Sequence, residues 1–206
     1  MKSLIIFTAL LSIAFGDRQF TVKNNCGFTI WADVIPNGET NIQLNSRQSR
    51  SFSRPDNWSG RIYPKRANDR APYTLAEFTL GGYKGMDFYD ISLVDGFNVP
   101  LAIHVSSSDN CRSPSCRADL NANCPAELKR VQNGLTTCES ACTKFHQDQY
   151  CCQGAHGQPN TCSPSNYSRY FKQACPDAYS YAYDDPSSTF TCRADSSTRY
   201  EVVFCP

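Results

Sequence analysis

Apolar and polar side chains alternate along several short segments of the chain. Alternation with a period of two places the apolar side chains on one face of a β-strand and the polar ones on the other. These segments are rich in β-branched and aromatic residues and are separated by Gly, Pro, Asn and Asp, which favour turns. The pattern predicts strands at residues 19–23, 28–35, 88–94, 101–105 and 198–204. Many short strands with one polar face indicate an all-β fold, an antiparallel β-sandwich.

The second half of the chain is rich in Cys: eleven of the twelve Cys of the chain lie in residues 111–206. Helical segments are predicted there at residues 125–131, 139–150 and 165–175, the last with Ser165 as N-cap and Pro176 as its stop. Segments dense in Cys are typical of regions too thin to form a core of their own. We therefore expect a sandwich from residues 17–117 and 177–206, and a disulfide-rich lobe with short helices from residues 118–176.

The N-terminal segment predicts export. Residues 1–16 combine an early Lys2, an apolar run and small residues at Ala14 and Gly16, which is the pattern of a secretory signal peptide. The apolar run is shorter than the roughly 20 residues that cross a bilayer, so we expect no stable membrane anchor. Removal of the predicted signal peptide removes Lys2 and leaves a mature chain with 19 basic and 19 acidic residues. This balance argues against nucleic acid as a partner.

An even number of Cys behind a signal peptide predicts six disulfides, although spacing alone does not fix their pairing. Two glycosylation sequons, at Asn57 and Asn166, agree with the secretory route. A zinc site formed by Cys138, Cys142, His146 and His156 is a weak alternative, because thiolates of secreted proteins are normally oxidised. We expect neither a metal nor a cofactor.

Three carboxylates lie within an otherwise apolar stretch, at Asp87, Asp90 and Asp95. Strand alternation places Asp90 and Asp95 on opposite faces, so these two carboxylates share a site only if the chain turns at Asp95-Gly96. An Asp-Gly step favours such a turn. The simpler alternative is that Asp95 only forms the turn and that Asp90 is an edge charge.

Several segments carry a family resemblance. They read NNCGFTIWA at 24–32, TLAEF at 74–78, DFYDISLVDGFNVP at 87–100, YCC at 150–152, FKQACPDAYSYAYDD at 171–185, TFTC at 189–192 and VVFCP at 202–206. The chain resembles the thaumatin-like proteins, which are pathogenesis-related class 5 proteins, along its whole predicted mature length. Residues 62–76 contain no Cys, whereas larger family members carry two more disulfides in this region. The chain therefore resembles the small type.

The resemblance implies a complete pairing of the cysteines: Cys26–Cys205, Cys111–Cys192, Cys116–Cys175, Cys124–Cys138, Cys142–Cys151 and Cys152–Cys162. It also implies an acidic cleft between the sandwich and the lobe. The residues that match this cleft are Arg61, Glu77, Asp90, Asp95 and Asp177. A purely structural polar network that braces the two parts is the alternative role for these five residues.

The resemblance further implies a secreted, extracellular host-defence protein, antifungal or antimicrobial, that acts as a monomer on β-1,3-glucan of microbial walls. Binding would use the cleft carboxylates, with Tyr89, Phe97 and Tyr179 as candidates for stacking on sugar rings. A weak endo-β-1,3-glucanase is an alternative, with Glu77 as acid and Asp90 or Asp95 as second carboxylate. Membrane perturbation and inhibition of a digestive enzyme are further alternatives.

Overall fold

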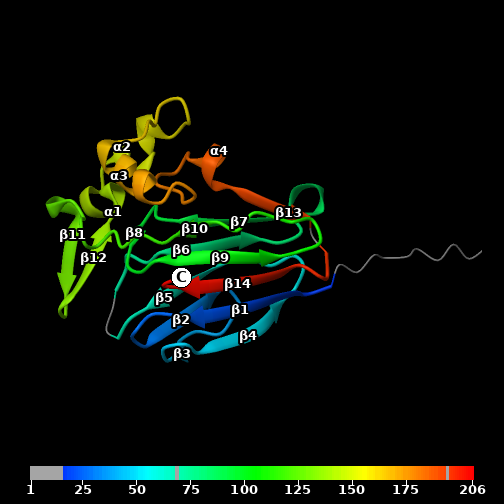
Figure 1. Cartoon of the computed structure of the whole chain (residues 1–206). Coiled ribbons are helices and arrows are strands. Elements are labelled where there is room, and N and C mark those ends of the chain that lie inside the picture. The colour runs from blue at the N-terminus through cyan, green and yellow to red at the C-terminus, as the bar shows by residue number, and fades with distance from the viewer. Residues whose placement is uncertain (1–15, 68–69, 194) are drawn as a thin grey trace, which may run out of the picture.

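The computed structural model describes residues 16–67, 70–193 and 195–206, so the predicted signal peptide, apart from Gly16, lies outside the described residues. Two large sheets face each other in this structure (Figure 1). The first contains, in spatial order, β10 (Ser115–Cys116), β9 (Leu101–Ser106), β14 (Arg199–Phe204), β1 (Arg18–Asn24) and β4 (Ser49–Arg54). The second contains β13 (Phe190–Arg193), β7 (Met86–Ser92), β6 (Leu75–Thr79), β5 (Ser59–Lys65), β2 (Ile30–Ile35) and β3 (Ile42–Leu44).

The two sheets pack through apolar side chains that alternate along the strands. Phe20 on β1, Phe78 on β6 and Tyr200 on β14 meet in the centre, with ring centroids 5.0 Å apart for Phe20 and Phe78. Neighbouring strands in these two sheets are antiparallel, except that β1 and β14 form a parallel pair in which Val22 lies opposite Val202. The predicted all-β sandwich is therefore confirmed, and the two ends of the described chain meet in one sheet.

A smaller part lies at one end of the sandwich and contains the helices α1 to α3 (Figure 1). Its three-stranded sheet has the order β11 (Lys129–Gln132), β12 (Leu135–Glu139) and β8 (Gly96–Phe97), so β8 joins this part to the sandwich directly after β7. The helices are α1 (Ala141–Phe145), α2 (Asp148–Cys151), α3 (Asn166–Ala174) and α4 (Asp185–Ser188), with 3₁₀ turns η1 (Tyr83–Gly85), η2 (Ala126–Leu128) and η3 (Gly154–His156). No helix among the described residues is long and apolar enough to cross a membrane.

Two of the three predicted helices need correction. The segment at 125–131 forms only the short turn η2 before it enters β11, because Asn133 and Gly134 close a hairpin with β12. The segment at 139–150 is divided into α1 and α2 by His146, which has a left-handed backbone with φ of 53°. Helix α3 is as predicted, since the Ser165 hydroxyl accepts a hydrogen bond from the Ser168 N–H.

The six disulfides pair in the order that the resemblance implies. Cys26–Cys205 spans a sequence separation of 179 residues and fastens the loop after β1 to the residue that follows β14. Cys138 and Cys142 bond to Cys124 and Cys151, so the thiolates of the zinc alternative do not exist. Within the described ranges, no three His, Cys, Asp or Glu side chains are arranged to hold a metal ion.

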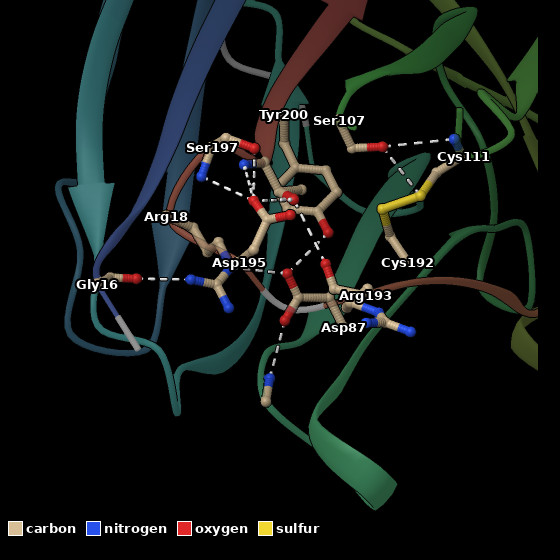
Figure 2. A network of polar contacts seen from close by, with 12 residues as sticks. Gly16, Arg18, Asp87, Ser107, Cys111, Cys192, Arg193, Asp195, Ser197 and Tyr200 are labelled. Carbon is tan, nitrogen blue, oxygen red and sulfur yellow. Dashed lines mark hydrogen bonds and ion pairs between the residues drawn. A yellow bond between two sulfur atoms is a disulfide. The ribbon is translucent and has the colours of Figure 1, made fainter. Parts of the chain in front are cut away.

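Asp87 belongs to the core and not to a surface site. Its carboxylate lies between the sheets, where Oδ2 accepts hydrogen bonds from Arg18 Nε and the Tyr200 hydroxyl, both at 2.9 Å (Figure 2). Oδ1 accepts a third hydrogen bond, from the Gly81 N–H, also at 2.9 Å. Arg18 is fully buried too and donates through Nη1 to the Gly16 carbonyl at 2.5 Å. This network fastens the start of β1 to β7 and β14.

Candidate functional site: a carboxylate groove on the outer sheet face

Three of the predicted cleft residues form a row across the six-stranded sheet. Arg61 on β5 lies opposite Glu77 on β6, and Glu77 lies opposite Asp90 on β7. Their sequence neighbours Ile62 and Phe78 are buried in the core. Because side chains alternate between faces, Arg61, Glu77 and Asp90 all project from the outer face of the sheet.

These three residues line one open groove of about 540 Å³. Its floor and walls are a mixture of polar and apolar side chains from β2, β5, β6 and β7. The lining residues are Ile35, Pro36, Ser59, Gly60, Arg61, Glu77, Phe78, Thr79, Phe88 and Asp90. A groove with few charged groups and apolar walls is the common form of a ligand site.

The two central carboxyl groups differ in their electrostatic environment. Burial, followed by the charges of Glu77 and Asp185, raises the pKa of Asp90 to about 8. Oδ1 of Asp90 is buried and has no hydrogen-bond partner among the described atoms. Burial also raises the pKa of Glu77, and the charge of Asp95 adds to this, but the Arg61 guanidinium and the Ser92 hydroxyl oppose it. At neutral pH the proton of this site therefore resides on Asp90.

Asp95 joins the site through a turn. Strand β7 ends at Ser92, and the Gly96 N–H donates to the Leu93 carbonyl at 3.0 Å, with φ of 129° at Gly96. The turn brings Asp95 close enough to raise the pKa of Glu77. Strand alternation in the sequence predicts that Asp90 and Asp95 can share a site only if the chain turns at Asp95-Gly96, and the structure contains this turn. The Asp95 carbonyl also accepts the Ser140 N–H at 3.1 Å, which connects the site to the lobe.

Asp177 does not take the place that the resemblance gave it. Its carboxylate accepts hydrogen bonds from Arg112 Nη2 and the Ser115 N–H, both at 3.2 Å, which hold it near β10. Asp185 is the carboxylate of the same segment that raises the pKa of Asp90. The adjacent acidic pair of that segment, at residues 184–185, was the signal in the sequence that could have indicated it.

Tyr179 holds this segment beside β7. Its backbone forms a parallel bridge at Ser92, with the Tyr179 N–H donating to the Ile91 carbonyl at 2.8 Å. Its hydroxyl donates to Asp185 Oδ1 at 2.9 Å and also contacts the Thr189 hydroxyl. Tyr179 is half-buried beside the carboxylates, and its role as a stacking residue stays a prediction.

The prediction that Tyr89 and Phe97 stack on sugar rings is wrong. Tyr89 is 1% exposed and packs against Phe190 and Tyr200 in the core. Phe97 is fully buried on β8, opposite Cys138 of β12. Both rings are therefore inaccessible to a ligand.

Both sequons lie at the surface. Asn57 is exposed in the turn between β4 and β5, and Asn166 is exposed at the first residue of α3. Either side chain is therefore accessible to modification.

Comparison with known proteins agrees with the fold. Residues 65–206 match the Thaumatin family. The chain is 44% identical over 234 aligned positions to pathogenesis-related protein 5 of Arabidopsis thaliana, covering 98% of this chain and 97% of that protein. It is 44% identical over 213 positions to an α-amylase/trypsin inhibitor of Zea mays, covering 91% and 99%. A β-1,3-glucanase domain (GH64) from Clostridium beijerinckii shares the fold, with a TM-score of 0.58 at 12% identity, covering 95% of this chain and 100% of that one.

Proposed function

Because the chain belongs to the thaumatin family and is similar to pathogenesis-related proteins, we propose that it is a secreted defence protein that binds β-1,3-glucan in the carboxylate groove. The observation that supports this most is the row of Arg61, Glu77 and Asp90, which lines an open groove on one sheet face. A guanidinium donates and a carboxylate accepts hydrogen bonds, so the row matches pairs of sugar hydroxyls. The half-buried Phe88 offers an apolar wall to the faces of the sugar rings.

A binding experiment tests this proposal. Purified protein is incubated with insoluble β-1,3-glucan, and the bound fraction is measured beside Arg61→Ala, Glu77→Ala and Asp177→Asn. We expect the first two variants to lose about tenfold or more in affinity, since each removes a hydrogen-bonding group of the groove. Asp177→Asn is the matched control, because it alters a carboxylate that is paired with Arg112 outside the row. Equal binding of all variants would mean that the glucan binds elsewhere.

A weak glucanase activity is the second candidate, and the protonated Asp90 favours it. The raised pKa of Asp90 supports this residue as the general acid and Glu77 as the second carboxylate, the reverse of the roles expected from the sequence.

The same incubation separates binding from hydrolysis when released reducing sugar is measured. Asp90→Asn keeps the shape of the neutral carboxylic acid but has no acidic proton to give to the leaving oxygen. If the wild type releases sugar and Asp90→Asn only binds, the groove is a slow glycosidase. If neither releases sugar, the protein is a binder. If the wild type does not bind, α-amylase and trypsin inhibition should be assayed, because a Zea mays relative is named for it. Leakage of polysaccharide-free liposomes would instead favour membrane perturbation.

Secretion forms part of the proposal and has its own test. Expressed with residues 1–16, the protein should accumulate in the culture medium, and its N-terminal sequence should begin at Asp17. Enzymatic removal of N-glycans should lower its mass, and the Asn57→Gln and Asn166→Gln variants identify which site carries the glycan. Retention of the full chain in the cell would contradict secretion.

A further inference from the structure

The outer face of the six-stranded sheet continues past the carboxylate row toward the other end of β2 and β5. Ile35 pairs with Arg61, Asp33 with Tyr63, and Trp31 with Lys65. Because each step is two residues, all of these side chains share the face of the groove. We propose that Trp31, Tyr63 and Tyr73 form an aromatic extension of the groove, which binds the part of a linear β-glucan chain that reaches beyond the carboxylates. This inference rests on the proposed function.

The first part of the extension is a pair of stacked rings. Tyr63 and Tyr73 have ring centroids 4.9 Å apart and an interplanar angle of 15°. Tyr63 is two residues from Arg61, which is about 7 Å along a strand. Arg61 and Tyr73 both influence the pKa of the Tyr63 hydroxyl, which agrees with their closeness. The ring pair therefore adjoins the cationic end of the groove.

Polar contacts hold Tyr63 in place. Burial and a hydrogen bond to Asp33 raise the pKa of Tyr63 to about 12, so the hydroxyl stays neutral and donates. Asp33 is itself fixed by Lys65 Nζ at 2.8 Å and by the Asn41 N–H at 2.6 Å. A ring with a fixed orientation loses little conformational entropy when it binds a ligand.

The second part of the extension is a groove of about 390 Å³ at the far end of β2, lined by Phe28, Trp31, Arg66 and Leu135 among others. The Arg66 guanidinium lies 3.9 Å from the centroid of the Phe28 ring and covers that face. Trp31 is half-buried and is the aromatic residue of this groove on the shared sheet face. It is four residues from Ile35, which corresponds to about 13 Å along the strand.

The chemistry of the extension fits a linear polysaccharide. Half-buried rings alternate with charged groups along the shared face, from Trp31 and Lys65 through Tyr63 and Asp33 to Arg61. A β-linked glucan offers apolar ring faces and hydroxyl edges along one chain, and aromatic rings with a few polar groups recognise this combination. The extension continues from the carboxylate groove on the same strands, so one chain can lie across both.

Affinity as a function of chain length tests the inference. Calorimetric titration with β-1,3-linked gluco-oligosaccharides, from the disaccharide upward, compares the wild type with Trp31→Ala and Tyr73→Leu. We expect each variant to lose about tenfold in affinity for the long oligosaccharides and to keep the affinity for the shortest one that binds. Tyr73→Leu keeps an apolar side chain against Tyr63. Tyr83→Ala is the control, since Tyr83 is a 74% exposed aromatic residue outside this face.

Fluorescence gives a second readout. The chain has two Trp residues, and the indole of Trp58 donates to the carbonyl of Pro36, which lines the carboxylate groove, so the signal of Trp31 is the part of the emission change that is lost in Trp31→Ala. This part should appear with long oligosaccharides and not with short ones. If the wild type binds but the affinities of the variants rise with oligosaccharide length as much as that of the wild type, and Trp31→Ala keeps the whole emission change, the inference is wrong and the proposed function stands. If the wild type binds no oligosaccharide and no glucan, the proposed function fails, and the inference fails with it.

Discussion

Glu77 and Asp90 lie directly opposite each other on β6 and β7, yet the surroundings of Asp90 favour its protonated form more strongly than those of Glu77 do. Arg61 and the Ser92 hydroxyl favour the ionised form of Glu77, whereas Asp90 has a buried oxygen without a hydrogen-bond partner. Two neighbouring carboxyl groups do not readily ionise together in a partly buried site. The pair therefore holds one proton at neutral pH, and that proton resides on Asp90.

The pH dependence of stability tests this assignment. Native Asp90 keeps its proton up to about pH 8, whereas an Asp of the unfolded chain loses it near pH 4, about the ordinary value. Between these values the native state binds more protons, so the free energy of unfolding falls as the pH rises and levels off above pH 8. We expect the fall to be on the order of a few kcal/mol and to be clearly smaller in Asp90→Asn, where the raised pKa of Glu77 still contributes to it.

Thermal and urea unfolding at pH values from 4 to 9 measure this effect. Asp90→Asn should match the wild type near pH 4 and should be more stable at pH 9. Asp177→Asn serves as control and should follow the wild type, because Asp177 is paired with Arg112. Parallel pH profiles of wild type and Asp90→Asn would show that Asp90 is ionised in the native protein.

The buried contact of Arg18 with Asp87 predicts a large loss of stability when one partner is removed. Asp87→Ala leaves the fully buried guanidinium without its counter-charge, which typically costs about 3–5 kcal/mol. Tyr200→Phe removes only one of three donors to Asp87 and should cost about 1 kcal/mol. The double variant Arg18→Met, Asp87→Leu should recover most of the loss, since it removes both charges. Urea unfolding of the four proteins measures these differences, and a double variant no better than Asp87→Ala would refute the explanation.

Strand alternation was the part of the sequence that carried the most structural information. All five predicted strands occur as β1, β2, β7, β9 and β14, within a few residues. Strand β4 was not predicted because it is an edge strand of mostly exposed residues, SRSFSR, and an exposed strand needs no apolar face. Alternation also indicated that Tyr89 could not stack on a sugar, because the strand neighbour of an outward-facing Asp90 must point into the core.

Long-range pairing was the part that the sequence did not reveal. The bridge between Ser92 and Tyr179 joins segments far apart in the chain, and it brings Asp185 to the site in place of Asp177. No local spacing encodes such a contact. The same holds for the parallel pairing of β1 with β14, which depends on both chain ends being present together.

The disulfide that joins the two ends of the sandwich should stabilise the protein more than a short-range one. In the chain-entropy model, closing the loop of Cys26–Cys205 contributes up to about 5 kcal/mol, and closing that of Cys142–Cys151 about 2–3 kcal/mol. Other disulfides already constrain the chain and lower both values. We therefore expect the Cys26→Ala, Cys205→Ala variant to have the lower urea midpoint of the two double variants. The opposite order would mean that local strain or packing, and not loop length, governs their contributions.

Gly96 should control how the lobe and the carboxylate groove fit together, although it carries no functional group. Its φ of 129° is a conformation that residues with a side chain rarely adopt, and a Cβ there would lie 2.4 Å from the Cys138 carbonyl oxygen. Gly96→Ala should therefore push β8 away from β12 and move Asp95, which precedes it, away from Glu77.

The matched control for this change is Gly134→Ala, in the turn between β11 and β12. Gly134 also has a positive φ, of 76°, but a Cβ there would meet nothing within 4 Å. Backbone strain alone should cost the control about 1–3 kcal/mol, and Gly96→Ala should cost clearly more because it adds the clash with β12. Unfolding by urea measures the difference, and glucan binding should weaken in Gly96→Ala while Gly134→Ala binds normally. Equal stability and equal binding of the two variants would mean that β8 and β12 yield to the added methyl group and that the position of Asp95 does not depend on their close approach.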